Sequence, residues 1–81
     1  MPARRTATDL KGRRQDLQLT VEEFAAGIGV PVPEIQELEN GRGSDQRRNQ
    51  YAAWLTRIES WPAGKREREA NAARTGQRFQ Q

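Results

Sequence analysis

The sequence predicts an all-α protein, a compact bundle of four to five helices, and three observations support this fold class. Every convincing periodic segment repeats its apolar residues at the 3.6-residue spacing of a helix. No alternating apolar run bounded by hairpin turns occurs, so no strand is expected. Glycine, proline and helix-capping residues separate the periodic segments. The chain of 81 residues is long enough for one small domain.

The first predicted helix spans about residues 8–17 and follows a basic N-terminal arm, residues 1–7. Leu10, Arg14 and Leu17 fall on one face of this helix, because positions i, i+4 and i+7 lie above one another. The face turned toward the core therefore carries an arginine between two leucines.

The second predicted helix begins after Thr20. Thr20 and Glu23 have the spacing of a capping box, in which each side chain binds the backbone N–H of the other residue. Gly29 ends the helix, since glycine adopts the left-handed conformation of a C-cap at little cost. The apolar face of this helix consists of Val21, Phe24, Ala25 and Ile28.

A third helix follows an extended connection over residues 30–33, because a residue that precedes proline is disfavoured in the helical region. Pro33 can open this helix, which runs to about Glu39 with Ile35 and Leu38 facing inward. Two short helices joined by such a turn are a helix-turn-helix signal.

The fourth predicted helix spans about residues 46–60 and completes a domain over residues 8–61. Residues 62–81 form a polar, basic tail whose only large apolar residue is Phe79. Three roles stay open for this tail: it follows the backbone of a DNA partner, extends a dimer contact, or is solvated with no role, which is the default expectation. Its central part, residues 66–74, either forms a loose helix or orders only on a partner. The stripe along the fourth helix consists of Tyr51, Trp54, Leu55, Ile58 and Trp61.

The charges are unevenly distributed along the chain. Residues 1–14 carry five positive charges and one negative, residues 15–46 carry one positive and seven negative, and residues 47–81 carry eight positive and three negative. Basic flanks around an acidic middle indicate a polyanion partner that the flanks contact, and nucleic acid is favoured over simple solvation of these charges.

The composition argues against an enzyme. The chain has no histidine and no cysteine, so the commonest general base and the commonest metal ligands are missing. No glycine-rich phosphate loop and no paired-carboxylate site is evident, and no cofactor is expected. No apolar run approaches the ~20 residues of a membrane span, which favours a cytoplasmic location.

Two segments, in register, resemble one family of regulators. Residues 19–30, L-T-V-E-E-F-A-A-G-I-G-V, resemble the L-[ST]-Q-x-x-L-A-x-x-[LIV]-G-V segment of Cro/repressor-type (XRE-like) helix-turn-helix transcriptional regulators. Residues 35–41, I-Q-E-L-E-N-G, resemble the I-x-x-[LIW]-E-N-G segment of the same family. The similarity covers roughly residues 7–60.

The resemblance implies a lambda-repressor-like DNA-binding domain whose third helix lies in the major groove of double-stranded DNA. It further implies a sequence-specific, often autoregulatory transcriptional regulator of the phage, mobile-element or controller-protein type, associated with the nucleoid. Arg14 and Glu39 match a pair that commonly joins the first and third helices of the family. The residues implied to read bases are Val32, Pro33, Glu34, Gln36 and Glu37. Those expected to meet phosphates are Thr20, Asn40 and Arg42, together with Arg47, Arg48, Arg4 and Arg5.

The chain departs from the family pattern in two ways. Val21 replaces a usual polar residue, and the recognition helix is acidic. Glu37 can accept a hydrogen bond from cytosine, but Glu34 has no assigned partner and is repelled by phosphate. The basic arms are therefore expected to supply most of the affinity, which makes binding salt-sensitive. The acidity also supports a rival hypothesis, an antitoxin or anti-activator that binds a protein partner.

A homodimer on a pseudo-palindromic operator is expected, because a domain of this size covers one half-site. Trp54 and Trp61 exceed what three short helices need for a core. One of them is therefore expected to face the partner subunit.

Overall fold

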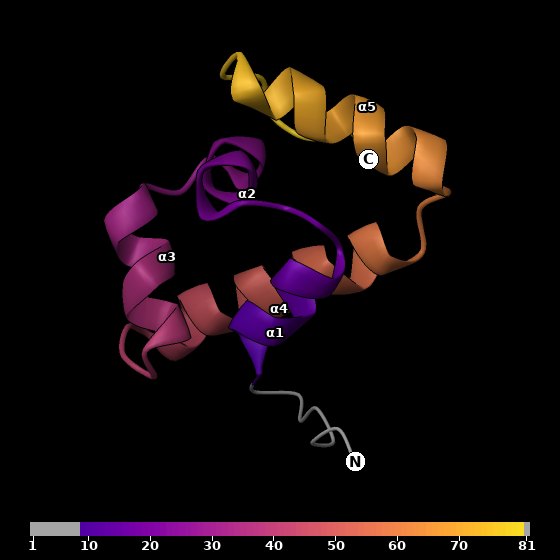
Figure 1. Cartoon of the computed structure of the whole chain (residues 1–81). Coiled ribbons are helices and arrows are strands. Elements are labelled where there is room, and N and C mark those ends of the chain that lie inside the picture. The colour runs from indigo at the N-terminus through magenta and orange to yellow at the C-terminus, as the bar shows by residue number, and fades with distance from the viewer. Residues whose placement is uncertain (1–8, 81) are drawn as a thin grey trace.

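The computed structural model describes residues 9–80, and this part of the chain is all-helical (Figure 1). It contains no strand, so the all-α prediction is confirmed for the described residues. The predicted bounds of the first four helices are correct to within two residues. The five helices are α1 (Leu10–Asp16), α2 (Val21–Ile28), α3 (Val32–Glu39), α4 (Asp45–Glu59) and α5 (Ala63–Arg74).

Helix α2 lies between α3 and α5. It contacts α3 on one side and α5 on the other, while α1 lies against α4 and also touches α3 (Figure 1). This arrangement presents α3 at one edge of the molecule. The core lies between these helices and includes the rings of Phe24 and Tyr51, whose centroids are 4.5 Å apart.

The two ends of α2 form as the sequence predicts. The Thr20 hydroxyl accepts a hydrogen bond from the Glu23 amide at 3.0 Å, and the Glu23 carboxylate accepts one from the Thr20 amide at 2.9 Å. Gly29 follows the helix in the left-handed conformation, with φ of 74°. The extended connection is shorter than predicted, because α3 begins at Val32 with Pro31 as its N-cap.

The C-terminal part of the chain corrects the expectation of a solvated tail without a core. Helix α5 packs along α2 and buries Ala70 and Ala73. Arg74 forms an ion pair with the buried carboxylate of Glu23, so the capping residue of α2 also anchors α5. The helix begins three residues before the loose helix suggested from the sequence.

Residues 76–80, which we call the C-terminal strap, continue from α5 across α2. The ring of Phe79 is buried, and its amide donates a hydrogen bond to the Gly27 carbonyl oxygen at 2.7 Å. A β-carbon at Gly27 would lie 2.2 Å from this ring, so the absence of a side chain there allows the strap to approach. The ring also contacts Trp54 and Trp61, with centroid distances of 5.9 and 5.7 Å. The only large apolar residue of the tail is thus part of the core.

Among the described residues, no helix combines the length and the apolar character needed to cross a membrane.

Candidate nucleic-acid interface

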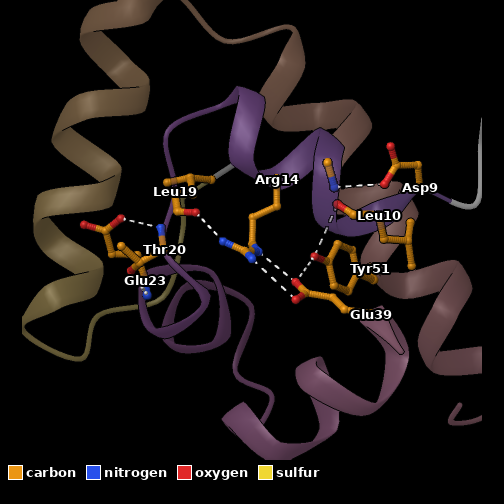
Figure 2. Close-up of polar contacts among 9 residues, drawn as sticks. Asp9, Leu10, Arg14, Leu19, Thr20, Glu23, Glu39 and Tyr51 are labelled. Carbon is orange, nitrogen blue, oxygen red and sulfur yellow. Dashed lines mark hydrogen bonds and ion pairs between the residues drawn. The ribbon is translucent and has the colours of Figure 1, made fainter. Parts of the chain in front are cut away.

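A buried polar network ties α3 to α1 and α4. Arg14 Nε donates to Glu39 Oε2 at 2.7 Å, and Arg14 Nη1 donates to the Leu19 carbonyl oxygen at 2.7 Å (Figure 2). The Tyr51 hydroxyl donates to the same Glu39 oxygen at 2.6 Å. The side chains of Arg14 and Glu39 are only 8% and 7% exposed, so the ion pair expected from the resemblance is an interior feature of this structure.

The environment of this network shifts two ionisation equilibria. Burial by itself lowers the pKa of Arg14, but the hydrogen bond and the charge of Glu39 outweigh it and raise the pKa above its ordinary value. Burial raises the pKa of Tyr51, and the adjacent Glu39 carboxylate raises it further. Arg14 therefore stays charged and Tyr51 stays protonated, and Glu39 is fully engaged inside the protein.

The expected base-reading residues all lie on α3 and differ in exposure. Pro33, Gln36 and Glu37 are exposed, whereas Val32 and Glu34 are half-buried. Val32 packs against the core at the start of the helix. A partner that approaches α3 from outside would therefore meet a polar surface with a small apolar edge.

Both outer glutamates of α3 are paired with arginines that follow the helix. Arg47 Nε lies 3.2 Å from Glu34 Oε1, and Arg42 Nη1 lies 3.6 Å from Glu37 Oε2. The four side chains are between 40% and 75% exposed. Glu34, which sequence reasoning left without a partner, thus neutralises an arginine that had been assigned to phosphate.

Arg48 is also engaged within the protein. Its guanidinium binds Asp45 Oδ1 at 2.7 Å and the Arg42 carbonyl oxygen at 3.2 Å. The three arginines expected to meet phosphates along this edge therefore each have a carboxylate partner. The edge formed by α3 and the start of α4 is close to electrically neutral in the free protein.

A hollow of about 350 Å³ lies between α1, the start of α2 and α3. Two residues assigned from the sequence to DNA contact, Gln36 and Asn40, line it, and so does Val21. Lys11 lines the same hollow and brings a positive charge that the sequence reasoning did not assign. Lys11 lies three residues before Arg14 on α1, and residues three apart are neighbours on a helix surface. Its position beside α3 could therefore have been predicted from the pairing of Arg14 with Glu39.

Thr20, Trp54 and Trp61 occupy defined positions outside this hollow. Thr20 is exposed, with its hydroxyl used in the capping box. Trp54 and Trp61 are half-buried against Phe79. A positively charged side chain lies close to each of the two indole rings. The Arg57 guanidinium lies 5.0 Å from the Trp54 ring centroid, and the Lys65 ammonium lies 4.8 Å from that of Trp61. Both tryptophans thus have partners within the chain.

Two assigned residues, Arg4 and Arg5, lie outside the described residues. Within residues 9–80, no group of three or more acidic side chains could hold a metal ion.

The comparisons with known proteins return no match, whether to family models, to curated proteins or to solved structures.

Proposed function

We propose that this protein is a sequence-specific DNA-binding transcriptional regulator in which α2 and α3 form a helix-turn-helix. The observation that carries the proposal is the α2–α3 pair. Two eight-residue helices are joined through Gly29, and Arg14 holds Glu39 at the end of α3 from the inside. The remaining polar side chains of α3 are left on its outer surface, where a helix in the major groove meets base edges.

Three side chains of α3 have the chemistry for base recognition. Gln36 is exposed and can bind adenine through its amide, and Glu37 can accept a hydrogen bond from cytosine N4. Pro33 is exposed at the start of the helix and can pack against a thymine methyl group. The proposed operator contacts therefore combine two polar and one apolar reader.

The paired arginines are compatible with phosphate binding. An exposed ion pair contributes only about 0–1 kcal/mol, so an arginine exchanges its carboxylate for a phosphate at little cost. Arg42 and Arg47 make such pairs with α3, and each carboxylate they leave becomes free to accept from a base. Arg42 and Arg47 would thus pair with glutamates in the free protein and with phosphates in the DNA complex.

We further propose that the protein is a cytoplasmic, nucleoid-associated homodimer that binds a pseudo-palindromic operator. The part of Trp54 or Trp61 that stays exposed is the surface assigned to the partner copy. Replacing either residue by alanine is expected to lower the mass measured by sedimentation. An unchanged mass in both variants would exclude these tryptophans from a dimer contact.

The decisive experiment titrates the protein against the upstream DNA of its own gene at two salt concentrations, with random duplex as competitor. Preference for the upstream DNA, with an affinity that falls steeply as salt rises, would support the regulator. Glu37→Gln should change the preferred sequence, whereas Glu67→Gln removes the same charge from an exposed site on α5 and should not. Equal affinity for both DNAs would contradict the proposal.

One observation favours a second candidate, a module that binds a basic protein partner. The carboxylate-bearing side chains of Glu34 and Glu37 are 44% and 51% exposed on the outer surface of α3. If the protein shows no preference among DNAs, co-purification from cells with wild-type protein and with a Glu34→Gln, Glu37→Gln variant tests this alternative. A partner lost only in the variant would support it.

A further inference from the structure

The C-terminal strap carries a cation to the turn between α2 and α3. A β-carbon built on Gly29 would lie 2.5 Å from Arg78 Nε and 2.6 Å from Arg78 Cζ, so the guanidinium lies directly over this glycine. Gly29 closes α2 and precedes the start of α3 at Val32 by three residues. Since three residues span at most about 11 Å, Arg78 lies near the N-terminal end of α3.

The backbone that follows Arg78 is held by contacts with two helices. The Phe79 amide donates to the Gly27 carbonyl oxygen at 2.7 Å, and the Phe79 ring is buried. The Gln80 amide donates to Glu69 Oε1 at 2.7 Å. The backbone of the strap is therefore fixed on α2 and α5, so only the side chain of Arg78, and not its backbone, has to be ordered when it binds a ligand.

Arg78 differs from the three arginines that follow α3 along the chain. Arg42, Arg47 and Arg48 each form an ion pair with a carboxylate. Within residues 9–80, Arg78 is exposed and has no ion-pair partner. Its charge lies beside the C-terminal end of α2, where the helix dipole favours a cation. This positive charge is thus available to an anion without the loss of an ion pair within residues 9–80.

We propose that Arg78 is a phosphate-binding residue of the DNA interface, supplied by the C-terminal strap at the N-terminal end of α3. The inference rests on the proposed DNA-binding function and adds a contact from outside the α2–α3 pair. It assigns to the strap two tasks, closure of the core through Phe79 and presentation of an unpaired cation beside an otherwise acidic helix.

The test compares Arg78→Ala with Arg68→Ala in titrations against upstream and random duplex over a series of salt concentrations. Arg68 is exposed on α5 and has no ion-pair partner in the described part of the chain, so both variants lose one positive charge. The logarithm of the affinity falls linearly with the logarithm of the salt concentration, and the loss of one phosphate contact makes this slope shallower by about 1. We expect this change for Arg78→Ala on both duplexes and no change of slope for Arg68→Ala.

Arg78→Lys is the second variant, because lysine also binds phosphate and should retain the wild-type slope. Circular dichroism of each variant monitors folding. Equal slopes for Arg78→Ala and Arg68→Ala would overturn the role of Arg78 while leaving the DNA-binding function intact. Failure of the wild-type protein to bind either duplex would instead overturn the proposed function, and this inference with it.

Discussion

Arginine–glutamate pairs occur on both the inner and the outer side of α3, but they have different roles. On the inner side, Glu39 binds Arg14 at 2.7 Å with both side chains under a tenth exposed. On the outer side, Glu34 binds Arg47 at 3.2 Å with both side chains at least 40% exposed. The sequence alone shows three glutamates on one short helix, and burial separates their roles.

The physical reason for the difference is the solvent around each pair. A buried charge that loses its partner has no water to replace it, so the pair is costly to break even when it adds little net stability. An exposed charge that loses its partner is rehydrated at once. The inner pair therefore holds α3 in place, whereas the outer pairs remain available for exchange with a ligand. Four predictions test this comparison.

The largest effect is expected from breaking the inner pair. Arg14→Ala and Glu39→Ala should each lower the free energy of unfolding by about 3–5 kcal/mol, because each leaves an unpaired buried charge. Since small domains have only about 5–15 kcal/mol of stability, the melting temperature should fall sharply. Chemical and thermal denaturation measure this, with Arg47→Ala as the matched surface control. An unchanged melting temperature in both variants would refute the structural role of the pair.

A smaller loss is expected when the third member of the network is shortened. Tyr51→Phe removes the hydroxyl that donates to Glu39 at 2.6 Å and keeps the ring against Phe24. A hydrogen bond to a charged group contributes about 1.5–3 kcal/mol, so unfolding free energy should fall by that amount. Denaturant titration at neutral pH tests this, and stability equal to wild type would show that water replaces the hydroxyl.

The same hydroxyl predicts a dependence on alkaline pH. Burial and the neighbouring Glu39 raise the pKa of Tyr51 above its ordinary value near 10. Above that value the unfolded chain loses the phenolic proton while the folded chain keeps it, so folding stability falls as pH rises. Tyr51 is the only tyrosine of the chain, and ultraviolet titration therefore reports on it alone. A phenolate signal near pH 10 in the folded protein would contradict the buried contact.

The smallest effect is expected at the outer surface. A double-mutant cycle with Glu34→Ala and Arg47→Ala should give a coupling energy of about 0–1 kcal/mol. Because both side chains are largely hydrated, this coupling should vanish at high ionic strength. The same cycle on Arg14 and Glu39 should stay large in high salt. Similar salt dependence for both cycles would remove the distinction between the two sides of α3.

Much of the fold was accessible from the sequence because its signals are local. The capping box of Thr20 and Glu23 joins residues three apart, and the left-handed glycine at position 29 ends the same helix. The core positions of α2 and α3 follow from helix periodicity. The assignment of Arg14 to Glu39 came from the family resemblance, and the structure contains that pair.

The candidate site was predictable only in part. The exposed residues Gln36 and Glu37 could be placed on the outer side of α3 from the resemblance. The pairing of Glu34 with Arg47 could not be predicted. It depends on the path of the loop after α3, which places the start of α4 beside α3. The proximity of Lys11 to α3, by contrast, could have been inferred, because Lys11 precedes Arg14 by three residues on α1 and Arg14 pairs with Glu39.

By itself, the sequence determined where α2 begins and ends and which face of it is apolar, since these depend on residues within one or two helical turns. Only the tertiary structure decided the role of the C-terminal part. The polar composition of α5 gives no strong apolar face, and its place on α2 depends on Arg74 reaching Glu23 and on Phe79 reaching Gly27. Such contacts join residues far apart in the chain, and they form only when the closed core offers a site for one aromatic ring.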